Sequence, residues 1–382
     1  MIIDIHGHLS PPEAAERFPM PPALTDVDGM LAARAEAGID LTIIGSPVGA
    51  GAMARVPGVD NYAQPRDRLR AFHAWMSGLI RRFPDQLRGY VYANPFGDDD
   101  HLEGVRETLA DPAFVGLITT SSVHGELLGS PRADPFFALA AEAGVPVLVH
   151  APAEPAGTER VGQTPFVEQI GRFGDVTLGM AMIAFAGWLD KYPGLRLIGA
   201  TGGGALALLP ERLETAARPR HWAGGAPAAG RPGTPKAPGA PGASGVPGAG
   251  GVAGTGGGPG AGGGPGAAPA PAAPPASGPA PASGPAPASG PAPAAGLAPS
   301  PDPAAALRRM YVDTSPFSAA HLSLNAEVLG PERMLFGTDS PPMAAPLEDF
   351  VRMVEKLPLD KASQQLILGG NAQALFDLRS RP

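Results

Sequence analysis

The feature that most constrains the fold of this chain is a regular alternation of strand-like and helix-like runs. Amphipathic, helix-like runs cover Val27–Ala37, Arg66–Arg82, Pro135–Ala143, Met180–Lys191, Ala319–Leu329 and Leu347–Lys356. Short apolar or β-branched runs with nearby Gly or Pro predict eight buried strands: Ile2–His6, Leu41–Gly45, Arg88–Ala93, Val115–Thr119, Val145–His150, Arg196–Ala200, Met310–Thr314 and Met334–Gly337. This pattern predicts a (β/α)₈ TIM-like barrel. A doubly wound sheet is the second interpretation, weakened because no Gly-x-Gly-x-x-Gly follows the first strand.

A low-complexity segment interrupts this alternation. Residues 223–302 are mainly Gly, Pro, Ala and Ser, and Gly-Pro-Ala-Pro-Ala-Ser recurs with drift. Such a segment buries too little apolar surface to offset the entropy cost of ordering, so we expect a long disordered linker with polyproline character. We therefore predict one barrel domain, built from residues 1–222 and 303–382, with 223–302 as a disordered insertion.

The amino-terminal strand carries two histidines one residue apart. Alternate side chains of a strand point to the same face, so we expect Asp4, His6 and His8 to project together. Ile3 and Ile5 would then lie on the opposite face. Two imidazoles from one rigid strand supply half of a metal site.

Two further candidate ligands follow other predicted strands. His150 ends the run Val-Pro-Val-Leu-Val-His, and Asp339 follows the last strand. Functional residues of a (β/α)₈ barrel gather at the carboxyl ends of the strands, so His6, His8, His150 and Asp339 should meet over the barrel mouth. Three imidazoles and one carboxylate suit one divalent ion, Zn²⁺ first, while Mn²⁺, Fe²⁺ and Co²⁺ remain open. Asp339 alone would also fit a helix cap.

Several stretches carry a resemblance to a known family. They are Ile-Asp-Ile-His-Gly-His at 3–8, Ala-Gly-Val-Pro-Val-Leu-Val-His at 143–150, Tyr-Pro-Gly-Leu-Arg-Leu-Ile-Gly-Ala at 192–200, Met-Tyr-Val-Asp-Thr at 310–314, Leu-Phe-Gly-Thr-Asp-Ser-Pro at 335–341 and Leu-Ile-Leu-Gly-Gly-Asn-Ala-Gln-Ala-Leu-Phe at 366–376. Together they resemble the amidohydrolase superfamily, in its amidohydrolase-related branch. Aminocarboxymuconate-semialdehyde decarboxylase typifies this branch. The resemblance implies that His6, His8 and His150 are metal ligands, with Asp339 as fourth ligand and catalytic proton carrier.

One position departs from the family pattern. Thr201 stands before three glycines where the family usually has a histidine that contacts a reacting oxygen. A threonine can donate a hydrogen bond but holds no proton at neutral pH, and loss of a general acid or base typically costs about 10²–10⁴ in rate. We therefore take Thr201 as a second candidate catalytic residue, in an altered or weakened reaction.

The resemblance leaves three functions open. The first is metal-dependent decarboxylation of a small carboxylated molecule, a carboxy-lyase activity. The second is metal-dependent hydrolysis of a small lactone, ester or amide. The third is a degenerate metal-binding barrel with little catalysis, which Thr201 favours. Members of the family are commonly dimers, so the resemblance is compatible with a homodimer.

The resemblance implies a small-molecule substrate, expected to be a carboxylic acid, and composition argues against macromolecular partners. The net charge is −8 and no dense Lys/Arg block occurs, which argues against nucleic acid or an anionic membrane. Cysteine is absent, which excludes thiolate ligands. No basic leader or long apolar run is present, so we expect a cytoplasmic protein. Arg55, Arg132 and Arg160 fall in predicted loops and could bind a carboxylate, although surface solubility explains each one as well.

Overall fold

Eight parallel strands form the centre of the fold in the computed structural model, which describes residues 1–218, 298–343 and 345–378. The strands are hydrogen-bonded in the order β1-β2-β3-β4-β7-β8-β9-β10. The ring closes because the Ile5 amide donates to the Phe336 carbonyl over 2.9 Å and Gly7 forms a parallel bridge with Ser340. The strand bounds are β1 Ile3–His8, β2 Leu41–Gly45, β3 Leu87–Tyr92, β4 Phe114–Thr120, β7 Val147–His150, β8 Leu197–Gly199, β9 Tyr311–Asp313 and β10 Met334–Leu335. This confirms the predicted TIM-like barrel.

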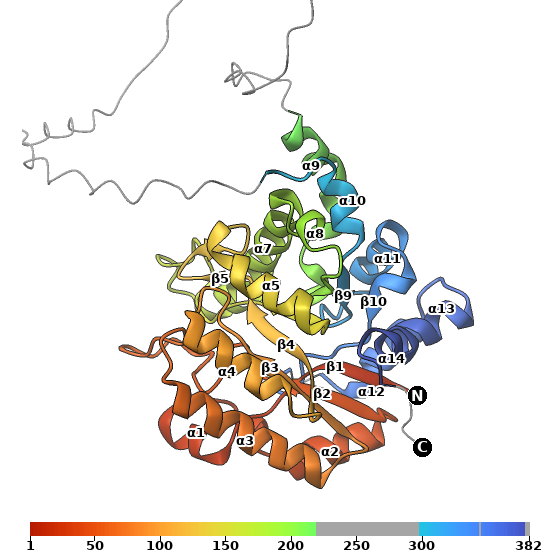
Figure 1. Ribbon diagram of the computed structural model, residues 1–382. Coiled ribbons are helices and arrows are strands. Elements are labelled where there is room, and N and C mark those ends of the chain that lie inside the picture. The colour runs from red at the N-terminus through yellow and green to blue at the C-terminus, as the bar shows by residue number, and fades with distance from the viewer. Residues whose placement is uncertain (219–297, 344, 379–382) are drawn as a thin grey trace, which may run out of the picture. The chain divides into compact units, whose positions relative to one another are not determined.

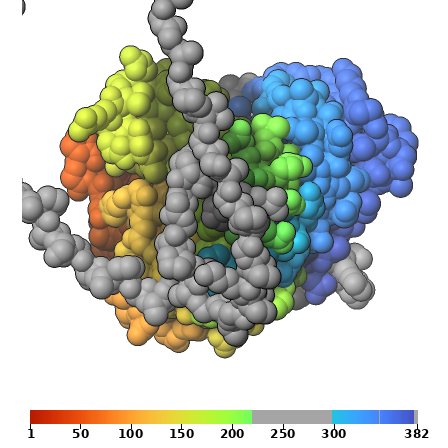
Figure 2. All heavy atoms as spheres, turned by 90° about the horizontal axis from the view of Figure 1, so that it is seen from above, coloured from red at the N-terminus to blue at the C-terminus, as the bar shows by residue number. Residues whose placement is uncertain are grey.

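Helices surround the strands (Figure 1). A small hairpin of β5 (Ser122–Val123) and β6 (Glu126–Leu127) follows β4. Helix α9 packs against α10, and Figure 2 shows the green and light-blue segments adjoining. The helix bounds are α1 Pro12–Arg17, α2 Val27–Glu36, α3 Arg66–Arg82, α4 Asp99–Leu109, α5 Asp134–Ala143, α6 Thr164–Phe166, α7 Arg172–Ala186, α8 Trp188–Lys191, α9 Pro210–Ala217, α10 Pro303–Arg308, α11 Ala319–Val328, α12 Leu347–Glu355, α13 Lys361–Gln365 and α14 Asn371–Leu375.

The core has two layers, which explains why the strands are apolar on both faces. One cluster fills the barrel interior and includes Ile43, Tyr90 and Ile118, with Leu375 and Phe376 from the end of the chain packed against it. The larger cluster lies between strands and helices. The barrel is therefore a packed core, and chemistry is left to its open end.

A β-bulge interrupts the first strand. Asp4 pairs with Thr42 of β2 while Gly7 pairs with Ile44, so β1 has one residue more than its partner in this interval. An extra residue of this kind turns the side chains that follow it to the other face of the strand.

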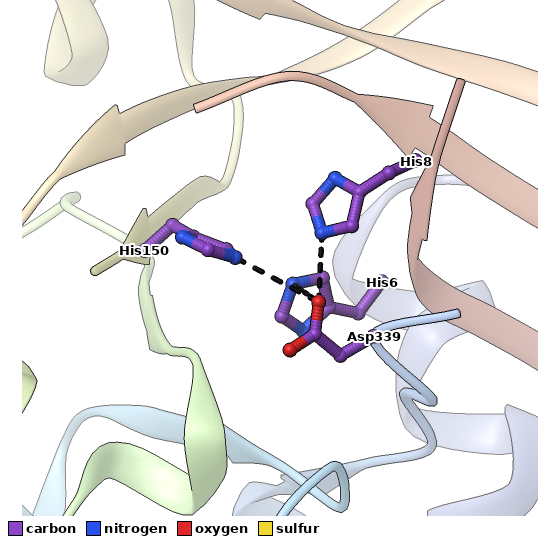
Figure 3. Close-up of side chains that lie close together, drawn as sticks. All are labelled: His6, His8, His150 and Asp339. Carbon is purple, nitrogen blue, oxygen red and sulfur yellow. Dashed lines mark hydrogen bonds and ion pairs between the residues drawn. The ribbon is translucent and has the colours of Figure 1, made fainter. Parts of the chain in front are cut away.

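The bulge corrects the expectation that Asp4, His6 and His8 share a face. Asp4 points toward the helix layer, where Arg34 of α2 donates to it over 3.1 Å. A side chain at Gly7 would meet the same arginine. His6 and His8 instead point over the barrel mouth toward the other candidate ligands (Figure 3). Alternation alone could not reveal this, because a bulge shifts the period by one residue.

The predicted strands and helices lie within two residues of the observed ones, except for one helix, while the short elements α1, α6, α9, α10, α13, α14, β5 and β6 had no prediction. The predicted helix Met180–Lys191 is two helices, α7 and α8, separated by Gly187 at φ 84°. Helix α4, which is longer, also lacked a prediction, although Asp98 caps it. The predicted linker, 223–302, lies almost entirely outside the described residues. No helix of the described part of the chain combines the length and apolarity needed to cross a membrane.

Candidate metal centre

Four side chains from distant parts of the chain meet at the barrel mouth. His6 and His8 come from the end of β1, His150 from the end of β7, and Asp339 from the loop after β10. One nitrogen or oxygen atom from each lies within 4.8 Å of all the others (Figure 3). The Asp339 Oδ1 atom is 2.9 Å from His8 Nε2, 3.5 Å from His6 Nε2 and 3.9 Å from His150 Nε2. The structure thus brings together all four residues that the sequence singled out as ligands.

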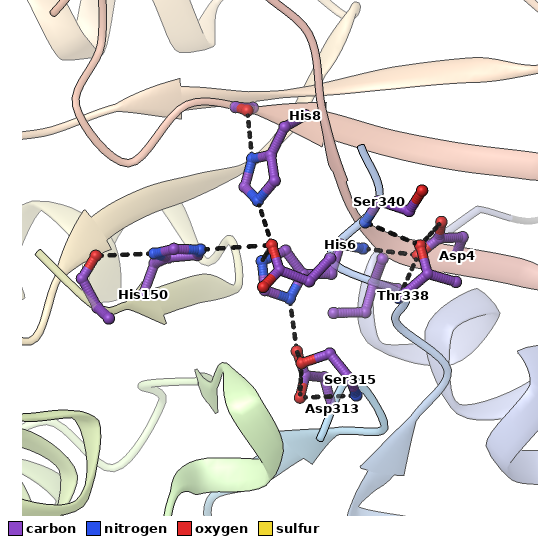
Figure 4. Close-up of polar contacts among 12 residues, drawn as sticks. Asp4, His6, His8, His150, Asp313, Ser315, Thr338 and Ser340 are labelled. Carbon is purple, nitrogen blue, oxygen red and sulfur yellow. Dashed lines mark hydrogen bonds and ion pairs between the residues drawn. The ribbon is translucent and has the colours of Figure 1, made fainter. Parts of the chain in front are cut away.

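The far nitrogen of each imidazole is held by an oxygen acceptor (Figure 4). His6 Nδ1 lies 2.5 Å from the Asp313 carboxylate, His8 Nδ1 lies 2.9 Å from the Gly45 carbonyl, and His150 Nδ1 lies 2.8 Å from the Ala151 carbonyl. An acceptor at Nδ1 assigns the proton to that nitrogen and leaves the Nε2 lone pair free.

The free Nε2 atoms have few partners of their own. Those of His6 and His150 are buried without a hydrogen bond among the described residues. Buried polar atoms normally have a partner, so these two orphaned nitrogens beside a carboxylate are the observation that fits the binding of a cation. Three imidazole nitrogens and one carboxylate oxygen form a donor set that accepts a divalent transition metal.

The pKa values of His6, His150 and Asp339 also favour a cation at this site. Burial lowers the pKa of His6, but the carboxylates of Asp339, Asp313 and Asp4 together raise it to about 9, so this ring favours a positive charge at Nε2, which either a second proton or a bound cation would supply. Burial lowers the pKa of His150 to about 4. Although burial opposes ionisation of Asp339, the neighbouring imidazoles hold the pKa of its carboxyl well below the usual range. Asp339 is therefore ionised at neutral pH, as a metal ligand must be.

Asp313 orients the deepest ligand and was missed as a site residue. Besides His6, its carboxylate accepts from the Gly202 amide over 2.6 Å and from the Ser315 hydroxyl over 2.9 and 3.0 Å (Figure 4). It is fully buried at the end of β9. The strand-end criterion that selected His150 would have selected Asp313 as well.

A second buried network fixes the loop that carries Asp339. The Asp4 carboxylate accepts from the amide and the hydroxyl of Thr338, over 3.0 and 2.8 Å, and from Arg34. Arg34 also donates to the Ser340 carbonyl over 2.5 Å. The two residues that flank Asp339 are thus tied to the base of β1, which carries His6 and His8.

Two residues at the mouth adopt strained backbone conformations. Thr201 has φ 52° and Asp339 has φ 55°, in the left-handed region that non-glycine residues rarely occupy. Such outliers cluster at functional sites because the surrounding structure holds them there. Thr201 lies just after β8, next to the Gly202 amide that binds Asp313. The structure thus places it beside the residues that orient His6.

A cavity of about 490 Å³ also opens on loops that follow the carboxyl ends of strands. Its lining comes from three segments, namely residues 54–62 after β2, 124–125 in the β5–β6 hairpin, and 153–159 after β7. Of the arginines considered from the sequence, Arg55 lines it but pairs with Glu154 at 2.9 Å. Arg132 pairs with Glu126 at 2.5 Å, and Arg160 is exposed.

Two histidines of the surrounding helices, His73 in α3 and His101 in α4, serve as hydrogen-bond acceptors for the backbone. His73 is buried, and its Nε2 accepts the Tyr92 amide over 3.0 Å. His101 Nε2 accepts the Asn94 amide over 2.9 Å. Both lie outside the cluster of four ligands. His221 falls outside the described residues.

A comparison with protein families matches the amidohydrolase model to residues 3–244 and 267–378, which is most of the chain. This chain belongs to the amidohydrolase family. A curated relative, the 2-amino-3-carboxymuconate-6-semialdehyde decarboxylase of Dictyostelium discoideum, is 26% identical over 166 residues. That match covers 42% of this chain and 46% of the relative, so it spans less than half of the relative's length. The family expected from the motifs is thereby confirmed.

Solved structures of similar fold cover nearly the whole chain. The 5-carboxyvanillate decarboxylase from Sphingomonas paucimobilis has a TM-score of 0.68 at 15% identity, covering 98% of both chains. A dihydroxybenzoic acid decarboxylase from Polaromonas sp. JS666, with bound manganese and 2-nitroresorcinol, has a TM-score of 0.65 at 15% identity, covering 100% of this chain and 98% of its own. At such identities the likeness concerns the fold.

Proposed function

We propose that this chain is a metal-dependent carboxy-lyase that removes a carboxylate from a small organic acid. The observation that carries the proposal is the convergence of three imidazoles and one ionised carboxylate, with two orphaned Nε2 atoms, at the barrel mouth. The relative and the similar structures named above are decarboxylases, which supports this reaction class.

In this proposal His6, His8, His150 and Asp339 hold the cation. Zn²⁺ is the first candidate from the donor set, and the manganese bound in a similar structure makes Mn²⁺ the second. A divalent ion in this place would polarise a substrate oxygen and stabilise the negative charge that develops as the carbon–carbon bond breaks.

The cluster can supply the one proton that decarboxylation needs. Loss of CO₂ from R–COO⁻ leaves an electron pair on carbon, and one proton converts it to R–H. Asp339 lies at the centre of the cluster and is ionised, so it would first take up a proton from solvent water and then pass it to that carbon. In hydrolysis the proton lost by the attacking water would have to be passed on to the leaving group. Thr201 can assist by a hydrogen bond to a substrate oxygen, but it cannot carry a proton.

Hydrolysis of a small lactone, ester or amide remains the second candidate, because it suits the same donor set and the family's name. The metal-reconstituted full chain would be tested for CO₂ release from a panel of aromatic and unsaturated acids, beside an esterase and lactonase panel. We expect CO₂ release from at least one acid. Turnover confined to esters or lactones would replace the first candidate by the second. Metal binding without turnover of any compound would support the degenerate barrel.

The role of Asp339 gives a sharper prediction. Asp339→Asn should lower kcat by about 10²–10⁴, because an amide cannot carry the proton. The control is Asp85→Asn, which changes an exposed aspartate just before β3, at the opposite end of the barrel. Metal content, measured by elemental analysis with His8→Ala as the ligand-deletion reference, separates lost catalysis from lost metal. An Asp339→Asn variant with full activity would contradict the mechanism.

A further inference from the structure

Thr120 carries a buried hydroxyl beside the candidate metal centre that the proposed mechanism leaves unused. It is the last residue of β4, and the strand register pairs it with His150 of β7. Two residues earlier Ile118 and Leu148 are paired, and both side chains lie in the cluster that fills the barrel interior. Because alternate side chains of a strand share a face, those of Thr120 and His150 lie side by side, one layer above that cluster.

The Thr120 hydroxyl shares the property that marks two of the metal ligands. The residue is 1% exposed, and its Oγ1 atom is buried without a hydrogen bond among the described residues, as are the Nε2 atoms of His6 and His150. Buried hydroxyls normally have a partner. A cation would satisfy the two nitrogens, whereas the hydroxyl needs a ligand with a hydrogen-bonding atom of its own.

The surroundings of Thr120 leave its proton available. The Tyr62 hydroxyl lies close to it but donates to the Ser122 carbonyl over 3.3 Å. Burial raises the pKa of Tyr62 to about 12 against the opposing effect of the Thr120 hydroxyl, so the phenol stays neutral and is a weak acceptor. A threonine hydroxyl can turn toward a stronger acceptor. A carboxylate oxygen is one, because hydrogen bonds to charged groups are roughly twice as strong as neutral ones.

Thr119 shows that burial without a partner is not sufficient for a binding role. Its Oγ1 atom is likewise buried and without a hydrogen bond in the part of the chain that the structure describes. It is paired with Val149, which belongs to the cluster between strands and helices. Thr119 therefore faces the helix layer, whereas Thr120 faces the mouth. The two threonines differ in the face of the sheet and not in burial, which makes Thr119 a matched control.

We propose that Thr120 is a substrate-binding residue whose hydroxyl donates a hydrogen bond to the carboxylate of the acid held at the metal centre. This inference rests on the proposed function, which makes the ligand a carboxylic acid. The carboxylate that leaves as CO₂ loses its negative charge in the transition state, so the contact stabilises the bound substrate more than the transition state. Loss of the hydroxyl should therefore raise KM without lowering kcat.

The test is a binding measurement that needs no turnover. The affinity of benzoate, a probe with one carboxylate, for the metal-loaded full chain would be measured by calorimetry. Thr120→Val keeps the shape of the side chain and removes the donor, so benzoate should bind at least about tenfold more weakly. Thr120→Ser keeps the hydroxyl and should stay close to the natural affinity. Thr119→Val should leave the affinity unchanged.

Thermal melting separates binding from a structural role. Replacement of an unpartnered buried hydroxyl by a methyl group removes a desolvation cost, so Thr120→Val should melt at the natural temperature or above it. A hydroxyl that holds the fold together would give a lower melting temperature. Metal content of each variant shows that the cation is retained, and Thr120→Ala replaces the valine variant if that one does not fold.

Two results would overturn the proposal: an unchanged benzoate affinity in Thr120→Val, or an equal loss in Thr119→Val. The lyase and the role of Thr120 can fail separately. Release of CO₂ with unchanged KM and benzoate affinity in Thr120→Val would refute only the role of Thr120. A weakened benzoate affinity in that variant, in a chain that releases no CO₂, would refute only the lyase.

Discussion

At the scale of single residues, the hydrogen bond at Nδ1 of each histidine orients the ring and so places its Nε2 atom for metal binding. Among the three acceptors at Nδ1, only that of His6 is a charged group, the carboxylate of Asp313. This carboxylate fixes the His6 ring and increases the basicity of its Nε2 atom as a metal ligand. The other two imidazoles meet neutral carbonyls. The deepest ligand is therefore the one whose metal affinity depends most on a neighbouring side chain.

Asp313→Asn should lower metal affinity about 10- to 100-fold, because the amide keeps the shape but loses the charge. The matched control is Asp175→Asn. Asp175 is an equally buried carboxylate, held by the Ser121 and Ser122 hydroxyls at 2.5 and 2.7 Å and not by a ligand. Competition against a chelator measures the metal affinity of both variants. Equal losses of affinity would show that any buried charge change disturbs the centre, and would contradict the role given to Asp313.

At the scale of elements, the bulge in β1 separates two tasks that a regular strand would combine. It turns Asp4 toward α2 while His6 and His8 face the mouth. The buried Asp4–Arg34 pair then links β1, α2 and the loop that carries Asp339. Such a pair is costly to break from one side, because the remaining charge stays buried.

Arg34→Met should destabilise the protein by about 3–5 kcal/mol, since it leaves the Asp4 carboxylate without its cation. The double variant Arg34→Met with Asp4→Asn should recover part of this loss. Arg81→Met, at an exposed pair with Asp111, should cost about 0–1 kcal/mol. Urea unfolding of the four proteins gives the comparison. A loss below 1 kcal/mol in Arg34→Met would mean that the pair does not anchor the loop.

At the scale of the whole molecule, stability depends on pH through buried neutral histidines. Burial lowers the pKa of His73 from 6.5 to about 3, and its Nε2 accepts a backbone amide that protonation would displace. The unfolded chain therefore binds one more proton between these values. The contribution of His73 to stability is complete above pH 6.5 and is lost as the pH falls toward 3.

His73→Gln keeps an acceptor without a titrating group. Between about pH 4 and 6, the free energy of unfolding should fall less steeply in this variant, by about 1.4 kcal/mol per pH unit. His124→Gln, at an exposed histidine, is the matched control. Chemical unfolding across this range, in a chelator so that metal release does not contribute, measures the slopes. Parallel slopes for the natural chain and His73→Gln would contradict the assignment.

We also propose that residues 223–302 connect the two parts of one domain without specifying its fold. Each halving of such a loop should stabilise the fold by only about 0.6 kcal/mol. Replacement of residues 223–297 by a short Gly/Ser segment should therefore leave metal affinity unchanged and the melting temperature equal or slightly higher. A large loss of either would give the segment a structural role. The close packing of α9 against α10 makes a short replacement feasible.

Local signals were enough to predict the eight strands, their alternation with helices and the four residues that meet at the mouth, because apolar runs and strand-end positions can be recognised along the chain. The opposite orientation of Asp4 and His6 could be seen only in the folded chain, since an unpaired strand does not show a bulge. Tertiary structure alone decided the role of Asp313 too, because that role depends on contacts with segments far along the chain. Local pattern fixes what a segment becomes, whereas long-range packing fixes which atoms face each other.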